Sequence, residues 1–255
     1  MMGATSLGLA LGGLAGFSAL KTGQISNRAS AQSYGSWQLG GVTHATPIHV
    51  AMLHTGKILY VAGSGFYAQN ELGPFQQGIY DPITDTDSPL PTIEEDMFCV
   101  GHNQLPNGNI LLTGGTLSYN NRSENGKWLG LNGAWIFDVA TNNLRRIESM
   151  KHGRWYPTHV TLNDGRVLVV GGWDEYGVQN RLAEVFDPAT ETFSIRYDPQ
   201  SSESWCAGQG QDPEIMPGAG ETCYGPGVAP NVLLYPRMHL MPEGLVVVCG
   251  QSKTL

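Results

Sequence analysis

Charged residues are scarce in this chain of 255 residues and make up 14% of it. Lys and Arg number 14 against 22 Asp and Glu, so the formal net charge is -8, and no run of five basic residues occurs. Nucleic acids and anionic membrane surfaces are bound through clustered Lys and Arg. We therefore expect no nucleic-acid partner.

Several catalytic and metal-binding motifs are also missing. The chain contains no Gly-x-Ser-x-Gly elbow, no phosphate-binding loop and no His-Glu-x-x-His pair, and its four cysteines lack the paired Cys-x-x-Cys spacing of a zinc site. Instead, the chain has 34 Gly and 15 Pro. This composition is typical of short strands joined by tight turns, because helices usually carry more Glu, Lys and Arg. We predict an all-β fold.

The N-terminal residues 1–31 differ from the rest. An uncharged apolar run, LGLALGGLAGFSAL (7–20), precedes Ala29-Ser30-Ala31, which offers a small-x-small cleavage site before Gln32. This arrangement resembles a secretory signal and predicts a secreted or cell-surface protein. Two alternatives remain, an uncleaved anchor and a disordered leader. The run is short for a bilayer span of ~20 residues, so we expect membrane contact only in the anchored case.

One pattern recurs four times: a turn that ends in glycine, four or five apolar residues, and glycine again. The segments are His54 to Gly65, Leu105 to Thr116, Leu162 to Trp173 and Met241 to Ser252. Turns such as Asn107-Gly108 favour hairpins, because Gly and Asn tolerate positive φ. The apolar run after each turn predicts a buried strand.

A second pattern, an aromatic residue followed by an Asp-led turn, recurs after the first three segments. Its copies are IYDPIT (79–84), IFDVAT (136–141) and VFDPAT (185–190). Two patterns that keep their order at intervals of ~50 residues indicate a kelch-type propeller of four-stranded blades. We predict about four blades over residues 32–255. Because a propeller closes to hide its strand edges, we expect the propeller to be incomplete and the chain to be the N-terminal portion of a longer protein.

A Gly- and Pro-rich insertion occupies residues 201–227, with Cys206 and Cys223 near its ends. Long loops in compact domains are usually functional or need to be pinned. A disulfide between the two cysteines would pin this loop in an exported protein. The alternative is that both stay unpaired in a surface loop, since pairing does not follow from sequence.

Two segments resemble blades of the copper radical oxidases, the family of galactose oxidase and glyoxal oxidase. They are DMFCVGHNQLPNGNILLTGGT (96–116) and MKHGRWYPTHVTLNDGRVLVVGG (150–172). The strings Asp-Met-Phe-Cys and Arg-Trp-Tyr-Pro-Thr are the specific part of the resemblance, which covers roughly residues 40–255. The family propeller has seven blades.

The resemblance implies a self-derived cofactor, a thioether between Cys99 and Tyr156, in which Tyr156 is also a copper ligand and holds a radical. Oxidation of an alcohol or aldehyde removes two electrons, whereas copper takes one, so the tyrosine takes the other. Imidazole and phenolate ligands suit copper. The resemblance implies Trp173, after Gly171-Gly172, as the tryptophan stacked over the modified tyrosine. Trp155 matches the glyoxal oxidase side of the family.

The remaining family ligands, a Tyr-His pair and a later histidine, do not occur in the 255 residues. The chain alone is therefore expected to be inactive. The plainer interpretation of Cys99 is a buried small hydrophobic residue. Cys249 is interpreted as core packing, His102 as a turn histidine bonded to backbone, and His159 as structural.

Two functional hypotheses follow. The first is a monomeric, exported copper radical oxidase that oxidises a small aldehyde or primary alcohol with O2 and gives H2O2. The second is a non-catalytic kelch-like propeller that binds a glycan or a protein, because one fold serves many functions.

Overall fold

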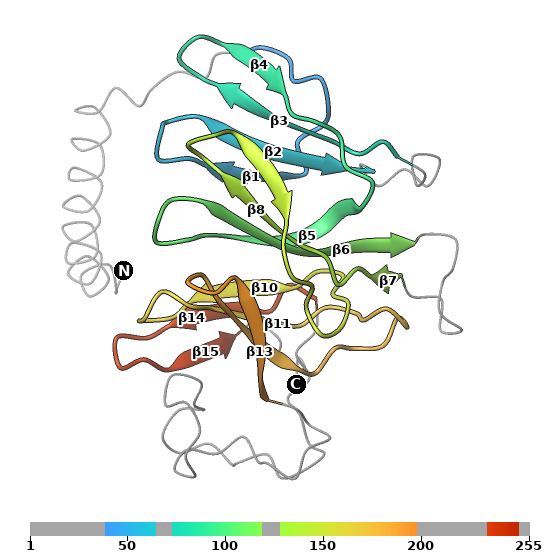
Figure 1. Ribbon diagram of the computed structural model, residues 1–255, viewed down its shortest axis with the longest axis vertical. Helices are drawn as coiled ribbons and strands as arrows, with labels where there is room; N and C mark the ends of the chain where they lie inside the picture. The colour runs from blue at the N-terminus through green and yellow to red at the C-terminus, as the bar shows by residue number, and fades with distance from the viewer. Residues whose placement is uncertain (1–38, 65–72, 119–127, 198–233, 250–255) are drawn as a thin grey trace, which may run out of the picture. The chain divides into compact units, whose positions relative to one another are not determined.

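The computed structural model describes residues 39–64, 73–118, 128–197 and 234–249. The chain divides into two units, 1–40 and 41–255, and the following concerns the second. All regular structure in the described residues is β-strand, as the all-β prediction requires (Figure 1). The leader, Cys206 and Cys223 lie outside the described residues, so the disulfide stays a prediction. No helix in the described ranges is long and apolar enough to span a membrane.

The strands form antiparallel sheets in chain order. The first sheet contains β1 (His49–Met52), β2 (Ile58–Gly63), β3 (Gln76–Asp81) and β4 (Thr86–Pro89). The second contains β5 (Asp96–Gln104), β6 (Ile110–Ser118), β8 (Ala134–Asp138) and β9 (Asn143–Arg146), with the short β7 (Leu129–Gly130) added to β6. The third contains β10 (Thr158–Thr161), β11 (Val167–Val170), β12 (Ala183–Asp187) and β13 (Thr192–Tyr197). A fourth begins with β14 (Arg237–Leu240) and β15 (Val246–Cys249).

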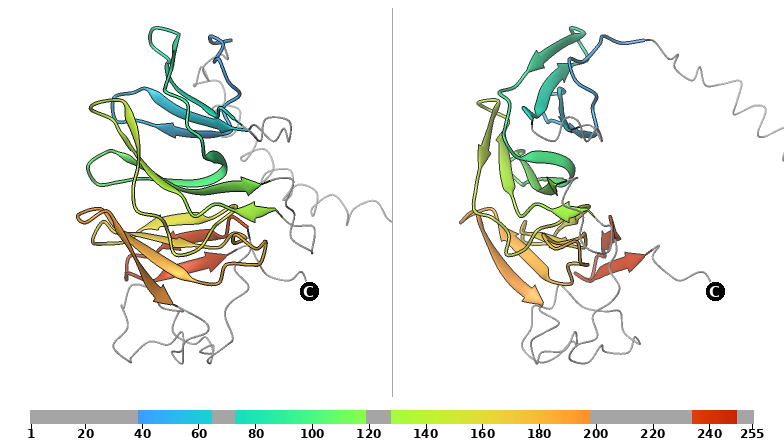
Figure 2. Two further views of the ribbon diagram at one scale, coloured as in Figure 1. Left: turned by 45° about the vertical axis from the view of Figure 1, so that its right-hand side comes forward. Right: turned by 90° about the vertical axis from the view of Figure 1, so that its right-hand side faces the viewer.

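In each complete sheet the four main strands pair in chain order, which makes a meander as in a propeller blade. Figure 2 shows the sheets following one another from the first, in blue, to the last, in red. The first strands of successive sheets are neighbours: β1 contacts β5, β5 contacts β10, and β10 contacts β14. The kelch-type blade architecture predicted from the repeats is therefore confirmed.

The four predicted hairpins share one turn geometry. In each turn the glycine donates its N–H to the carbonyl three residues earlier, at 2.8 to 3.0 Å. All four glycines have positive φ, between 83° and 86°. A side chain would be strained in this conformation, so the glycine in each copy of the repeat is required by the turn. The four glycines are Gly56, Gly108, Gly165 and Gly244.

The continuous apolar runs arise because the second strand of a blade is buried on both faces. Leu112 of β6 packs in a cluster with the first sheet, while its neighbour Leu111 packs in a cluster with β11. In β11 the same alternation places Val167 beside the second sheet and Leu168 beside β14. Side chains alternate along a strand, so a strand between two cores needs apolar residues at every position.

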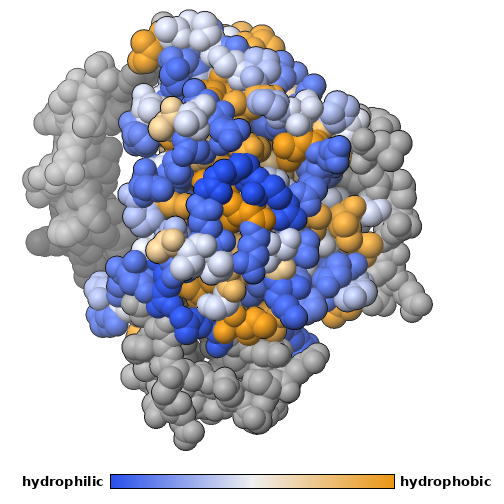
Figure 3. All heavy atoms as spheres, in the orientation of Figure 1, coloured by the Kyte–Doolittle hydropathy of each residue, from blue (hydrophilic) through white to orange (hydrophobic). Residues whose placement is uncertain are grey.

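The Asp-led turns also form as predicted. Asp81 accepts a hydrogen bond from the N–H of Ile83 at 2.9 Å, and Asp187 accepts one from Ala189 at 2.8 Å. These carboxylates cap their turns, as Asp commonly does. On the face drawn in Figure 3, hydrophobic patches lie between hydrophilic residues across the described sheets.

Candidate functional site

Cys99 and Tyr156 lie side by side although they belong to neighbouring blades. Cys99 is in β5 and is 2% exposed, and Tyr156 is half-buried just before β10. The N–H of Tyr156 donates to the carbonyl of Cys99 at 3.1 Å. The Tyr156 side chain also packs against the cluster that contains Cys99. The fold brings together the two residues that the sequence singled out, while their thioether stays a prediction.

The backbone is left-handed at both positions and at a third, Tyr235. The φ angle is 66° at Cys99, 72° at Tyr156 and 44° at Tyr235. Each residue lies nine positions before the glycine of its hairpin turn, so the three are equivalent positions of the repeat. Positive φ is uncommon outside glycine, and strained residues of this kind gather at functional sites. Tyr235 is thus a site residue that the sequence analysis did not identify.

Four aromatic rings form a stack through this site. The rings of Trp155 and Tyr156 are 3.9 Å apart between centroids and 9° from parallel. Tyr235 stacks on Tyr156 at 4.4 Å and 16°, and Trp173 stacks on Trp155 at 4.9 Å and 15°. When two rings each stack closely and nearly parallel on a third ring, they must lie on opposite faces of that ring. The order of the stack is therefore Trp173, Trp155, Tyr156, Tyr235.

The stack differs from the expected arrangement of tryptophans. Trp173 was the candidate for the ring that covers Tyr156, but the ring in direct contact with Tyr156 is that of Trp155. Trp173 lies one ring further, because its backbone pairs with Trp155 through hydrogen bonds of 2.7 and 3.0 Å. Trp128 contacts Trp155 edge-on at 4.7 Å. Trp155 is therefore the central residue of the cluster.

Tyr235 is held in place by two hydrogen bonds. Its N–H donates to the carbonyl of Tyr156 at 2.9 Å, and its hydroxyl donates to the carbonyl of Val100 at 3.1 Å. These bonds tie the start of β14 to β5 and to the segment before β10. The position of the Tyr156 ring is consequently fixed from both sides.

A close backbone approach explains the glycine pair after β11. At Gly172, φ is 89°, and a Cβ atom would lie 2.8 Å from the carbonyl oxygen of Trp155. Gly172 thus leaves room for the Trp155 backbone. Only glycine satisfies the conformation and the close approach together.

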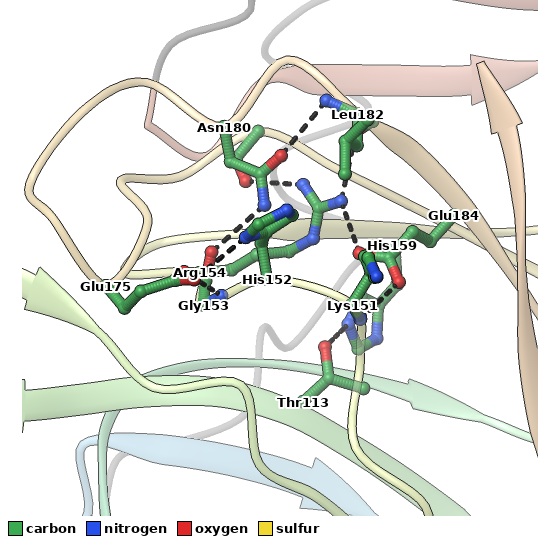
Figure 4. A network of polar contacts seen from close by, with 11 residues as sticks. Thr113, Lys151, His152, Gly153, Arg154, His159, Glu175, Asn180, Leu182 and Glu184 are labelled. Atoms are coloured by element: carbon green, nitrogen blue, oxygen red, sulfur yellow. Dashed lines mark hydrogen bonds and ion pairs between the residues drawn. The ribbon is translucent and has the colours of Figure 1, made fainter. Parts of the chain in front are cut away.

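A buried ion pair supports the segment that carries the stack. The Arg154 guanidinium donates to the Glu184 carboxylate at 2.9 Å, and both side chains are almost fully enclosed, at 0% and 1% exposed. Arg154 also donates to the carbonyls of Gly171 and Leu182, each at 3.0 Å. Figure 4 shows Arg154 at the centre of these contacts. The pair thereby links the segment before β10 to β12.

Further polar contacts hold the residues just before Arg154. The second carboxylate oxygen of Glu184 accepts from the N–H of Lys151 at 2.8 Å. Glu175 accepts from the N–H of Gly153 at 2.8 Å, and the Asn180 side-chain amide donates to the Gly153 carbonyl at 3.0 Å (Figure 4). The chain is thus fixed on both sides immediately before Trp155 and Tyr156.

Burial keeps the site's acidic groups protonated at neutral pH. Burial raises the pKa of the Cys99 thiol, although its hydrogen bond with Tyr156 opposes this rise. Burial and the contact with Cys99 raise the pKa of the Tyr156 phenol. Burial, with the nearby Cys99 and Tyr156, raises the pKa of Tyr235. A thiol held protonated is a poor nucleophile, so Cys99 is not suited to nucleophilic catalysis.

Three histidines gather on the first strands of successive blades. The rings of His49 in β1 and His102 in β5 are 5.9 Å apart. His159 in β10 shares a hydrogen bond of 2.8 Å with the Thr113 hydroxyl. Burial, followed by the proximity of His102, lowers the pKa of His49 to about 4 and that of His159 to about 3. The structural interpretation of His159 fits this position, whereas His102 lies in a strand rather than a turn.

A copper ion could be held only partly by the described residues. The half-buried phenol of Tyr156 is a suitable oxygen donor for copper. Within the described ranges, no cluster of three or more His, Cys, Asp or Glu is arranged to bind a metal. The described residues fit one ligand of a copper site and do not complete it.

The chain is similar to a known repeat motif and to several known proteins. Residues 154–196 match the kelch motif. A protein of Artemisia annua named as an aldehyde oxidase (Art an 7) is 28% identical over 74% of this chain and 27% of its own length. Galactose oxidase of Gibberella zeae is 29% identical over 45% of this chain and 15% of its own length. A solved structure of a fungal alcohol oxidase in complex with copper is 22% identical, covers 63% of this chain and 32% of that chain, and has a TM-score of 0.48.

The chain spans about a quarter or less of the length of these two relatives. The repeated hairpins, the four-stranded sheets and the kelch motif establish the architecture. Both relatives carry oxidase names. The chain has kelch-type β-propeller blades and is similar in sequence to proteins named as an aldehyde oxidase and a galactose oxidase.

Proposed function

We infer that the chain is part of an exported copper radical oxidase. The observation that carries this inference is the packing of Tyr156 against Cys99, two left-handed residues at equivalent positions of neighbouring blades. The substrate class is a small aldehyde or a primary alcohol. The signal-like residues 1–31 support export, and the oxidase relatives support the chemistry.

The reaction removes two electrons and two protons from the substrate, which O2 accepts to become H2O2. Copper, when bound, supplies one of the two one-electron couples. Tyr156 supplies the other: its phenol gives up one electron and its O–H proton and is later restored. A sulfur substituent from Cys99 lowers the free energy needed to oxidise the ring. The stacked rings of Trp155 and Tyr235 keep Tyr156 from rotating away from Cys99.

The thioether is the most direct test. After exposure of the full-length protein to copper and oxygen, mass spectrometry should find the Cys99 and Tyr156 peptides joined, with a mass lower by two hydrogen atoms than the sum of the two. The Cys99→Ser variant should give separate peptides and a tyrosyl radical that is harder to form. Unjoined peptides in the copper-treated wild type would overturn the proposal.

The second candidate function is a non-catalytic propeller that binds a glycan or a protein. The incomplete set of metal ligands among the described residues favours it. Peroxide release by the full-length protein separates the two functions: an oxidase should release H2O2 from glyoxal-like aldehydes or small primary alcohols. A binding module should release none and should retain glycan or protein binding in the Cys99→Ser variant.

A further inference from the structure

A tyrosine, a histidine and an aspartate meet at the first sheet, which contains neither Cys99 nor Tyr156. Tyr60 lies in β2 and is 1% exposed, Asp87 lies in β4, and His44 lies in the segment that leads into β1 (Figure 1). The Tyr60 hydroxyl donates to Oδ1 of Asp87 at 2.6 Å. Nδ1 of His44 lies 2.6 Å from Oδ2 of Asp87 and 2.6 Å from the Tyr60 hydroxyl oxygen. The proposed oxidase chemistry uses none of these three side chains.

Hydrogen bonds alone do not account for all three contacts. With the Asp87 carboxylate ionised, the Tyr60 phenol and Nδ1 of His44 supply at most two protons. Nδ1 carries either one hydrogen or one lone pair, and hydrogen-bond geometry lets it direct this at one oxygen only. One of the three contacts of 2.6 Å therefore joins two atoms that have no proton of their own between them. A cation between the side chains would attract all of these atoms at once.

The strand between those of Tyr60 and Asp87 leaves space for the cluster. Gly78 lies in the middle of β3 and has no left-handed φ, so its backbone conformation does not require glycine. A Cβ atom at Gly78 would clash with the Tyr60 hydroxyl and lie 2.8 Å from Cε1 of His44. Glycine inside a strand weakens the sheet and often marks a place that another group approaches closely. The cluster therefore explains this glycine.

We propose that His44, Tyr60 and Asp87 bind a divalent transition-metal ion, with Cu(II) as the ion that they hold most tightly. Imidazole nitrogen suits such ions, and nitrogen and oxygen ligands bind Cu(II) more tightly than the other divalent ions from Mn(II) to Zn(II). Bonds of about 2.0–2.2 Å place neighbouring ligand atoms roughly 3 Å apart, so the three side chains need to separate only slightly. As the ion binds, the Tyr60 phenol gives its proton to water. The resulting phenolate and the carboxylate balance the two charges of the ion.

The bound ion would fasten the segment before β1 to two strands of the first sheet. The His44 side chain is 25% exposed, so the site is open to solvent on this side. His44 belongs to no strand, which leaves its ring free to adjust to an ion, while its backbone N–H already donates to Asp87 at 2.9 Å. The site goes beyond the proposed oxidase function and does not depend on it.

Titration of the full-length protein with Cu(II) tests the site. The protein is first freed of metal with a chelator, and binding is followed by equilibrium dialysis and by visible absorption. We expect His44→Gln to bind one Cu(II) ion per chain fewer than the wild type. Tyr60→Phe, which keeps the ring and removes the oxygen, should lose the part of the phenolate-to-Cu(II) charge-transfer absorption that belongs to this site.

The pair of His152 and Glu175 provides the matched control. It is a histidine–carboxylate contact of 2.8 Å outside the cluster, and its side chains are 39% and 28% exposed. His152→Gln should leave both the bound Cu(II) and the absorption unchanged. If His152→Gln and His44→Gln lose equal amounts of Cu(II), copper binds to exposed histidines in general and the site is refuted.

Thermal unfolding gives a second measurement. An ion that binds only the folded state raises the unfolding midpoint, so Cu(II) should raise the midpoint of the wild type more than that of Asp87→Asn. Midpoints without metal show whether each variant folds, and His44→Gln keeps the test available if a strand variant unfolds. Variants that all bind Cu(II) as the wild type does would show that protons alone hold the cluster together. Each of these results is independent of whether a thioether and peroxide release are found.

Discussion

Single side chains outside the aromatic stack determine whether its residues are held in place. Arg154 stands next to Trp155 in the sequence, yet its guanidinium reaches away from the stack to Glu184 and two carbonyls. A buried ion pair loses hydration on both sides, so it needs hydrogen bonds that replace most of that hydration, as those of the two terminal nitrogens of Arg154 do. Removing one partner should therefore lower the free energy of unfolding by more than the ion pair contributes to it.

The Glu184→Gln substitution tests this at the level of one residue. It leaves the Arg154 charge buried without a counter-charge, and we expect the free energy of unfolding to fall by about 3–5 kcal/mol. Urea unfolding followed by tryptophan fluorescence measures the change.

The ion pair of Arg145 and Glu191 is the control. Its side chains are 41% and 37% exposed, and exposed pairs contribute about 1 kcal/mol or less. Glu191→Gln should thus have a small effect on urea unfolding. Equal losses in the two variants would contradict the role given to burial.

The sequence indicated some of these residues and missed others. Cys99 and Tyr156 were found through their family-like strings. Tyr235 was missed, although a signal was present: Tyr235-Pro236 repeats Tyr156-Pro157 at the same distance from the turn glycine. That Trp155 rather than Trp173 contacts Tyr156 depends on backbone pairing between distant segments, which residue order alone does not give.

At the scale of strands and turns, the sequence predicted the structure better than it predicted the contacts between single side chains. Glycine in the turns and apolar residues after them determined the hairpins, because both effects are local. The glycine pair after β11 has a further requirement that is not local. Gly172 must leave room for the Trp155 carbonyl, which approaches from the segment before β10.

The Gly172→Ala substitution should separate these requirements. A left-handed φ costs an L-residue roughly 1–2 kcal/mol, and the clash of the new Cβ with the Trp155 carbonyl adds to this. We expect lower unfolding free energy in urea and a changed near-ultraviolet circular dichroism signal from the stacked tryptophans.

Gly56→Ala is the matched control for this substitution. Gly56 has a φ of 83°, and no atom lies within 4 Å of where its Cβ would be. Gly56→Ala should lose only the unfolding free energy that the left-handed φ costs, and its near-ultraviolet circular dichroism signal should stay unchanged. If both variants lose the same stability with unchanged spectra, the close approach at Gly172 is unimportant.

On the scale of the whole molecule, successive blades bring together histidines that are far apart in the sequence. His49, His102 and His159 occupy the first strands of three sheets. Burial lowers the pKa of each of them. Folding therefore keeps these histidines neutral at a pH where the unfolded chain would bind protons.

Stability should accordingly fall as the solution becomes mildly acidic. The pKa of His49 drops from an ordinary value of 6.5 to about 4 on folding. Above pH ~6.5 the ring is neutral in both states; below it, only the unfolded state gains a proton until the pH nears 4. Each buried histidine should lower the free energy of unfolding by about 1 kcal/mol at pH ~5.5. Thermal unfolding midpoints between pH 7 and 5 measure the effect.

The histidine origin of this slope can be checked by substitution. His49→Gln should flatten the slope, whereas carboxylates with lowered pKa such as Asp138 act only at lower pH. A wild-type midpoint that stays constant from pH 7 to pH 5 would show that the histidines titrate freely in the folded protein.

The sequence by itself determined the blades and the pair at the site. Turn glycines, apolar runs and Asp-led turns act through neighbours in the chain, and their order repeats at a fixed interval. Only the tertiary structure decided which rings touch. The stack, the buried Arg154–Glu184 pair and the histidine cluster each join different strands or blades. Such contacts depend on how twisted sheets pack against one another, and no local pattern encodes that geometry.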